Sequence, residues 1–120
     1  MRTKEEIKLG QNIRLGLNEI LKLWASVDEQ IEYQINVPIA DVSAELFCKW
    51  CDDYYNDGDP IMLKEFNKME LKLLKDFDEV ICQVANNTPE ELPNINEFIK
   101  TNEWKRVHIK AISTIKKLQW

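Results

Sequence analysis

Turn-forming residues are scarce in this chain, which has only three glycines and four prolines among 120 residues. So low a content argues against a barrel or a sandwich, in which tight turns join many short strands. The sequence also lacks a run of roughly 18 apolar residues, the length of a membrane-spanning helix, and an apolar segment after the basic N-terminus. These absences predict a soluble, cytoplasmic protein.

Histidine and cysteine, the usual ligands of zinc, are also few. His108 is the only histidine, and with three cysteines it would make the minimum set for zinc, without the usual second C-x-x-C or H-x-x-x-H. Cys48 and Cys51 form a C-x-x-C, but it falls well inside a predicted helix, where the helix N-terminus cannot lower a thiol pKa. We therefore expect Cys48, Cys51 and Cys82 to be structural or surface residues, and we expect no metal and no cofactor.

Charge is abundant and unevenly distributed. Residues 25–63 contain nine acidic side chains and one basic, and residues 64–97 contain eight acidic and four basic. Residues 98–120 reverse this balance, with six basic side chains and one acidic, so the net charge of −5 conceals an acidic centre and a basic last segment. The two could neutralise each other within the fold, or the centre could face a basic partner. The acidic centre also opposes binding of nucleic acid by the last segment.

Hydrophobic periodicity predicts an all-α fold, a single domain over residues 1–120 that forms a bundle of four to six helices. A capping box of Thr3 and Glu6 begins the first helix, over about 4–24. Residues 31–37 alternate as a strand would, but we favour a helix from 27 to about 35 because a lone strand would have no pairing partner. The remaining helices are expected over 39–56, from 61 or 67 to 85, over a short segment after Asn94, and from Asn102 onward.

The same periodicity predicts which side chains face the core. For the helix over 39–56 these are Val42, Leu46, Phe47, Trp50, Cys51 and Tyr54. For the segment up to 85 they are Met62, Phe66, Met69, Leu73, Phe77, Val80 and Val84. For the last helix they are Trp104, Val107, Ala111, Ile115 and Leu118.

The strongest candidate site is the segment of residues 52–59, which we call the acidic turn. Gly58 would be the sixth residue of an EF-hand loop, but Tyr55 and Lys64 then occupy ligand positions, so this calcium motif is excluded. Two adjacent tyrosines cannot both face inward from one helix, so at least one should lie at the surface. There it could anchor a partner that the acids select. The candidate partner-binding residues are Asp52, Asp53, Tyr54, Tyr55, Asp57 and Asp59.

Asp53-Tyr54-Tyr55 in a small acidic helical chain resembles the immunity proteins of DNase colicins, although Asn56 follows where that family has proline. Trp50 in an acidic helix, the Phe66 to Val84 helix, and Asn102-Glu103-Trp104 opening the last helix are similar to immunity proteins of contact-dependent and polymorphic toxin systems. The resemblance implies a non-enzymatic bacterial protein that occludes a basic cognate toxin.

Two alternatives remain open at this point. One is a small thiol- or metal-dependent enzyme that uses Cys48, Cys51 and His108. The other is a homodimeric helical domain in which the acidic centre of one copy meets the basic last helix of another.

Overall fold

The computed structural model describes residues 2–89 and 91–120. This part of the chain contains seven α-helices, one π-helix and no strand, and five of the α-helices have seven residues or more. The all-α prediction is confirmed. The count of seven exceeds the predicted four to six because the segment expected to form one helix up to residue 85 is divided into two, α4 and α5.

Local capping begins the first two helices where the sequence predicts. Helix α1 (Lys4–Ala25) starts at Thr3, whose capping box with Glu6 is complete. Helix α2 (Val27–Asn36) starts at Ser26, whose side chain accepts a hydrogen bond from the Glu29 backbone N–H. Residues 27–35 are therefore helical, and no strand forms there despite the alternating pattern of the sequence.

The middle of the chain differs from the prediction. Helix α3 (Val42–Cys48) begins three residues later than expected, at its N-cap Asp41, and continues as the π-helix η1 (Lys49–Tyr54). Both starts proposed for the next segment occur, because the segment forms two helices. Helix α4 (Pro60–Glu65) ends before Asn67, and the capping box of Asn67 with Glu70 begins α5 (Lys68–Asn87). Helices α6 (Ile95–Phe98) and α7 (Asn102–Leu118) complete the chain.

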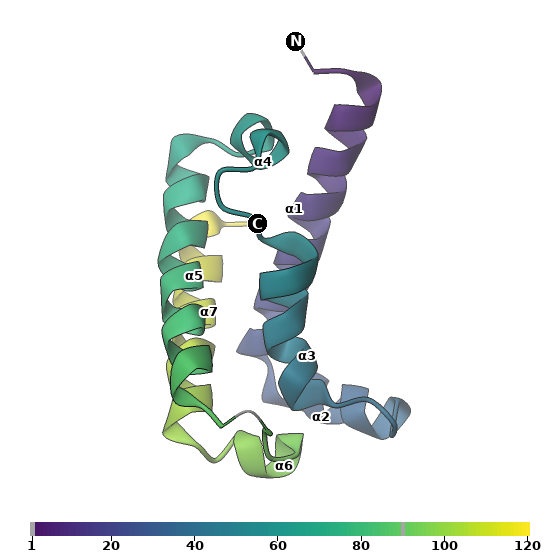
Figure 1. Ribbon diagram of the computed structural model, residues 1–120, viewed down its shortest axis with the longest axis vertical. Coiled ribbons are helices and arrows are strands. Elements are labelled where there is room, and N and C mark those ends of the chain that lie inside the picture. Colours follow the sequence, from purple (N-terminus) through teal and green to yellow (C-terminus); the bar gives the residue numbers. More distant parts are fainter. Residues whose placement is uncertain (1, 90) are drawn as a thin grey trace.

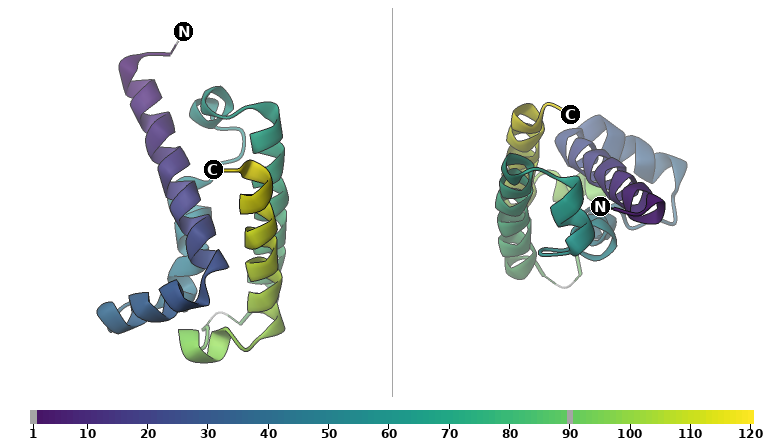
Figure 2. Two further views of the ribbon diagram at one scale, coloured as in Figure 1. Left: turned by 180° about the vertical axis from the view of Figure 1, so that it is seen from behind. Right: turned by 90° about the horizontal axis from the view of Figure 1, so that it is seen from above.

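Helices α5 and α7 lie side by side and make the most extensive helix contact, and α7 also packs on α1 (Figure 1). Helix α3 is in front in this view, whereas α7 is in front when the molecule is seen from behind (Figure 2). Helix α2 leaves the lower end of α1 and extends sideways from the bundle. Within the described residues, no helix combines the length and apolar character needed to cross a membrane.

Three buried tryptophans join the helices, and each indole N–H has a partner. Trp24 donates to the Leu46 carbonyl at 2.9 Å, Trp50 to Asp78 Oδ1 at 3.0 Å, and Trp104 to Gln30 Oε1 at 2.9 Å. Buried polar groups must be paired to avoid a desolvation cost, so these bonds fix how α1, α2, α3, η1, α5 and α7 meet.

A second set of contacts ties the ends of the chain to its middle. We call it the Arg14 cluster, and it consists of Arg2, Arg14, Glu65, Glu70 and Trp120. Arg14 pairs with Glu65 at 2.7 Å and with Glu70 at 2.8 Å, and Arg2 pairs with Glu65 at 3.0 Å. The Trp120 indole N–H donates to Glu70 Oε2 at 2.9 Å.

The Arg14 cluster explains one wrong prediction about the core. Met69 was expected to face inward but is 56% exposed, and Leu73 and Val80 are only half-buried. The buried face of α5 instead contains Glu70, Leu74, Phe77, Ile81 and Val84. Arg14 and Trp120 bind the Glu70 carboxylate, so this glutamate lies on the inner face. The buried residue is the next one along the chain at three of the predicted positions, while Phe77 and Val84 are buried as predicted.

Two smaller predictions about the core are also wrong. Cys51 is exposed, although the periodicity placed it inside the helix over 39–56. Ile115 is half-buried, and Thr114 is the buried residue beside it. The Thr114 hydroxyl donates to the Lys110 carbonyl at 2.7 Å, so a polar side chain can lie on the buried face of α7.

Candidate functional site: the acidic turn after a π-helix

The acidic turn begins inside η1, which replaces the last turns of the predicted helix over 39–56. The Tyr55 backbone N–H donates to the Trp50 carbonyl at 2.9 Å, a bond that spans five residues. A π-turn admits one extra residue and so changes the direction of the side chains that follow. Tyr54 and Tyr55 therefore meet different neighbours.

Tyr54 lies on α1. A Cβ atom at Gly16 would overlap the Cδ1 and Cε1 atoms of the Tyr54 ring, so only glycine permits this approach. Gly16 is buried in the middle of a long helix, where glycine otherwise weakens helix stability. The close packing of the tyrosine gives a physical reason for a helix-weakening residue at this position.

Tyr55 lies on the opposite side of η1. Its ring stacks on the Trp50 indole with centroids 5.1 Å apart and planes 12° apart, and its hydroxyl donates to Asp57 Oδ1 at 3.5 Å. Burial, together with the charges of Asp57 and Asp78, raises the pKa of the Tyr55 phenol above its usual range. The phenol is therefore a neutral hydrogen-bonding group.

Both tyrosines are half-buried, so each lies at the surface with part of its ring packed against the protein, where the sequence led us to expect at least one at the surface. The expectation assumed a single regular helix through residue 56. Because Tyr55 is the C-cap of η1 and has an extended backbone, it leaves the helix and turns back onto Trp50. Each phenol thus presents only part of its surface to solvent.

Asp52, Asp53 and Asp57 are exposed, and Asp59 is half-buried. The Asp59 side chain accepts a hydrogen bond from the Ile61 N–H at 3.1 Å, so it caps α4. Gly58 has a φ of +79°, the left-handed conformation that lets the chain reverse before this cap. None of the four aspartates forms an ion pair with any residue that the structure describes.

A hollow of about 340 Å³ separates the acidic turn from α5. Tyr55, Asn56 and Asp57 line one wall, and Lys72 and Glu79 are among the residues of the other. The Lys72 amine is 3.6 Å from Asp76 Oδ2, so it pairs along α5. Lys75 also lines the hollow, but it forms no ion pair with Asp57 across it. The hollow is open and polar enough to receive a side chain of a binding partner.

Asp78 is a residue of this region that sequence reasoning missed. Its Oδ1 accepts the Trp50 indole N–H and lies 3.6 Å from Cys82 Sγ, so it joins α5 to the helix that carries the acidic turn. The sequence offered one signal for its role: Asp78 directly follows the core residue Phe77 and lies four residues before Cys82, on the same side of the helix.

The three thiols are poorly suited to nucleophilic chemistry. Although the Cys51 residue as a whole is exposed, partial desolvation of its thiol, with the neighbouring Cys82 and Asp78, raises the pKa of this thiol to about 12. Burial also raises the pKa of Cys48, together with Asp52, and that of Cys82, together with Asp78. The thiolate is the reactive form, so these shifts oppose catalysis by cysteine at neutral pH.

His108 makes its contacts with the tryptophans of α1 and α7. Its Nδ1 is 2.8 Å from the Trp24 carbonyl oxygen, and its ring stacks on Trp104 with centroids 4.4 Å apart. Among residues 2–89 and 91–120, no group of three or more His, Cys, Asp or Glu side chains is placed to hold a metal ion.

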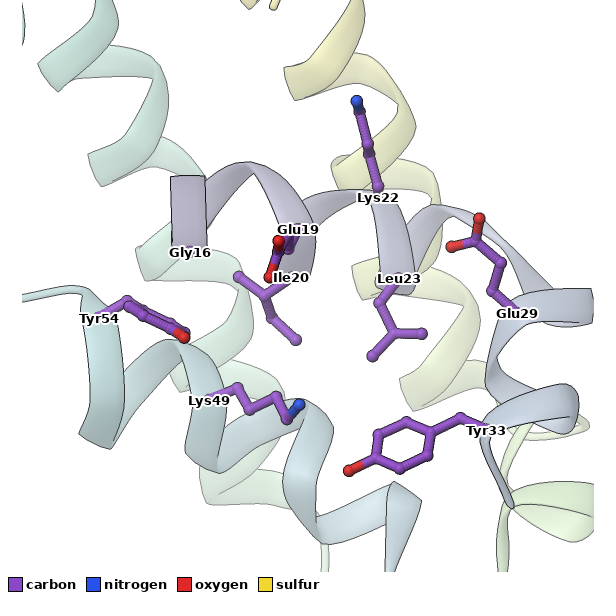
Figure 3. Close-up of a pocket in the computed structure, with 9 residues that line it drawn as sticks. All are labelled: Gly16, Glu19, Ile20, Lys22, Leu23, Glu29, Tyr33, Lys49 and Tyr54. Carbon is purple, nitrogen blue, oxygen red and sulfur yellow. The ribbon is translucent and has the colours of Figure 1, made fainter. Parts of the chain in front are cut away.

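A second hollow, of about 360 Å³, lies between α1, α2 and η1 (Figure 3). Its lining includes Tyr54, Tyr33 and Lys49, and the Lys49 amine lies over the Tyr33 ring at 5.1 Å. Lys49 is the single basic residue of the acidic segment 25–63, and it occupies this hollow itself. The hollow adjoins the acidic turn through Tyr54.

Comparisons of the chain with protein-family models, with curated proteins and with solved structures give no match. The resemblance to immunity proteins therefore stays a prediction from the sequence.

Proposed function

We propose that this chain is a non-enzymatic binding module that neutralises a basic cognate protein, as an immunity protein does with its toxin, by covering it with the acidic turn. The observation that carries the proposal is the unpaired charge of Asp52, Asp53, Asp57 and Asp59 among the described residues. Clustered charge of one sign steers an oppositely charged protein toward its binding site.

The basic last helix does not supply the missing counter-charge through ion pairs. The outer side chains of α7, which are Lys105, Arg106, Lys116 and Lys117, are exposed and form no ion pair within the described part of the chain. Helix α7 also faces the side of the molecule opposite to α3, which leads into the acidic turn (Figures 1 and 2). This separation favours an acidic face for a partner over neutralisation within the fold.

The tyrosines add a rigid element to this face. Tyr55 is held flat on Trp50, and its phenol bonds Asp57, so binding would cost little conformational entropy. Aromatic residues with a polar tip are frequent anchors of interfaces. The raised pKa values of the thiols support a binding function in preference to the thiol-dependent enzyme.

The gene that neighbours this one in the genome provides the test. We expect it to encode a large secreted protein with a toxic C-terminal domain. Cells that express that domain alone should stop growing, and co-expression of this chain should restore growth. The variant Asp52→Lys/Asp53→Lys should lose protection, whereas Lys116→Ala/Lys117→Ala should keep it. A metabolic operon at this position, or full protection by the aspartate variant, would contradict the proposal.

A further inference from the structure

Helix α2 and the loop after it, residues 27–41, form what we call the α2 arm, which extends away from the bundle (Figure 1). Its base is firmly held, because the only fully buried residue of α2 is Gln30. The Gln30 amide donates to the Leu23 carbonyl at 2.8 Å and its oxygen accepts the Trp104 indole N–H at 2.9 Å. The arm thus has a fixed direction relative to α1 and α7.

The tip of the arm holds apolar side chains out in water. Gln34 braces the loop: its amide nitrogen donates to the Ala40 carbonyl at 2.6 Å and its oxygen accepts from the Val42 N–H at 3.4 Å. With its backbone tied inward, the loop leaves Ile39 97% exposed, and Ile35 in the last turn of α2 is 70% exposed. A braced loop that exposes isoleucine is typical of a contact surface prepared in advance.

Acidic side chains precede these isoleucines on the same side of α2. Asp28, Glu32 and Ile35 follow one another at steps of four and three residues on one face of α2, and Ile39 lies in the loop beyond the helix end. Asp28 and Glu32 are exposed and form no ion pair with any described residue. The arm therefore presents two acids followed by two isoleucines.

Helix α7 presents isoleucines together with charge of the opposite sign on its outer face. Lys105, Ile109, Ile112 and Lys116 follow at steps of four, three and four residues, which places them on one stripe that we call the α7 stripe. Ile109 is 65% exposed and Ile112 is 43% exposed. The buried face of α7 contains other residues, so the α7 stripe is free of the core.

We infer that the α2 arm of one copy docks on the α7 stripe of a second copy. Both surfaces are exposed in the folded chain, so neither covers the other within one molecule. Their charges are opposite and each offers two isoleucines, so association would pair carboxylates with amines and remove apolar surface from water. The acidic turn belongs to neither surface, and this inference does not depend on the proposed function.

Sedimentation velocity on the full chain, from about 1 μM to about 1 mM, tests the inference, because this range covers weak protein–protein contacts. We expect the weight-average sedimentation coefficient to rise with concentration in low salt and less so in high salt. A closed dimer, or an open chain of copies, would each support docking. A monomer over the whole range at low salt would overturn it.

Charge reversal identifies the surfaces involved. Asp28→Lys/Glu32→Lys and Lys105→Glu/Lys116→Glu should each weaken association at least tenfold, since each places like charges together. The variant with all four reversals keeps the net charge of −5 and should associate again. All four positions are exposed, and circular dichroism will verify that the helices are retained. Failure of the fourfold variant to regain association would overturn this pairing of surfaces.

Two further variants separate the apolar contact from general charge effects. Ile39→Ser should weaken association about fivefold or more, because the isoleucine buries apolar surface only in the complex. Asp52→Lys/Asp53→Lys makes the same change of charge as the reversal on the α2 arm and should leave self-association unchanged. Equal weakening by this control would indicate unspecific charge attraction and would overturn the inference.

Discussion

The Arg14 cluster and the acidic turn each contain four charged side chains, but only the Arg14 cluster pairs them. In the cluster, two arginines meet two glutamates, and the Arg14 guanidinium also lies 4.7 Å from the Phe66 ring centroid. In the acidic turn, four aspartates have no basic partner among the described residues. In the cluster the charges stabilise one another within the fold, whereas the charge of the turn stays available for the basic partner that we propose.

The largest effect is expected from Arg14→Ala. The substitution leaves the poorly solvated Glu70 without an ion-pair partner and leaves Glu65 with Arg2 alone, so the free energy of unfolding should fall by about 2 kcal/mol. We expect less than for a fully buried pair because the arginine is partly exposed. Urea unfolding followed by tryptophan fluorescence measures this change. Lys22→Ala, on the exposed side of the same helix, is the control, and an equal effect of both would remove the contrast between the regions.

Gly16→Ala tests how firmly the candidate site rests on the core. A methyl group would collide with the Tyr54 ring, so the free energy of unfolding should fall by about 1 to 2 kcal/mol. In a Tyr54→Ala background the collision is absent, and alanine should instead stabilise α1 by up to about 1 kcal/mol. Thermal or urea unfolding of the native chain, Gly16→Ala, Tyr54→Ala and the double variant gives the coupling free energy between the two positions. A destabilisation that persists without the tyrosine would contradict the contact.

The pH dependence of stability sharpens the contrast between the two regions. Burial alone would raise the pKa values of Glu65 and Glu70, but hydrogen bonds and charge from Arg14, with smaller contributions from other partners, lower both. Their contribution is therefore complete above the ordinary glutamate pKa of 4.5 and is lost as the pH falls through the lowered values. The difference in stability between the native chain and Arg14→Ala should shrink on acidification below pH about 4.5. A constant difference down to pH about 2 would show that the ion pairs do not cause it.

The smallest effect on stability is expected from Asp52→Ala/Asp53→Ala. Both side chains are exposed and have no ion pair in the described part of the chain, so the free energy of unfolding should change by less than about 0.5 kcal/mol. Chemical unfolding beside the native chain provides the measurement. A loss of more than about 1 kcal/mol would mean that the acidic turn supports the fold as well.

The helix starts were predictable because they depend on residues close in sequence. The capping boxes at Thr3 and Asn67, and the start of α4 at Asp59 and Pro60, lie where the sequence predicts them. In each case one side chain binds backbone N–H groups two or three residues away. No distant contact is needed for such a boundary.

The parts that sequence reasoning missed depend on distant partners. The π-helix carries Trp50 and Tyr54, whose partners Asp78 and Gly16 lie in other helices, so no local pattern reveals its register. Gln30 is likewise buried by bonds to residues up to 74 positions away. The six residues of the candidate site were named from the sequence, but the inward packing of both tyrosines could not be derived from it.

The most direct test of the account is the association rate between this chain and the toxic domain encoded by the neighbouring gene, measured by stopped flow over a range of ionic strengths. The account predicts that Asp52→Ala/Asp53→Ala slows association several-fold at low ionic strength, and that the difference narrows as salt screens the charges. An association rate equal to that of the native chain at low ionic strength would contradict the claim that the acidic turn is the binding face.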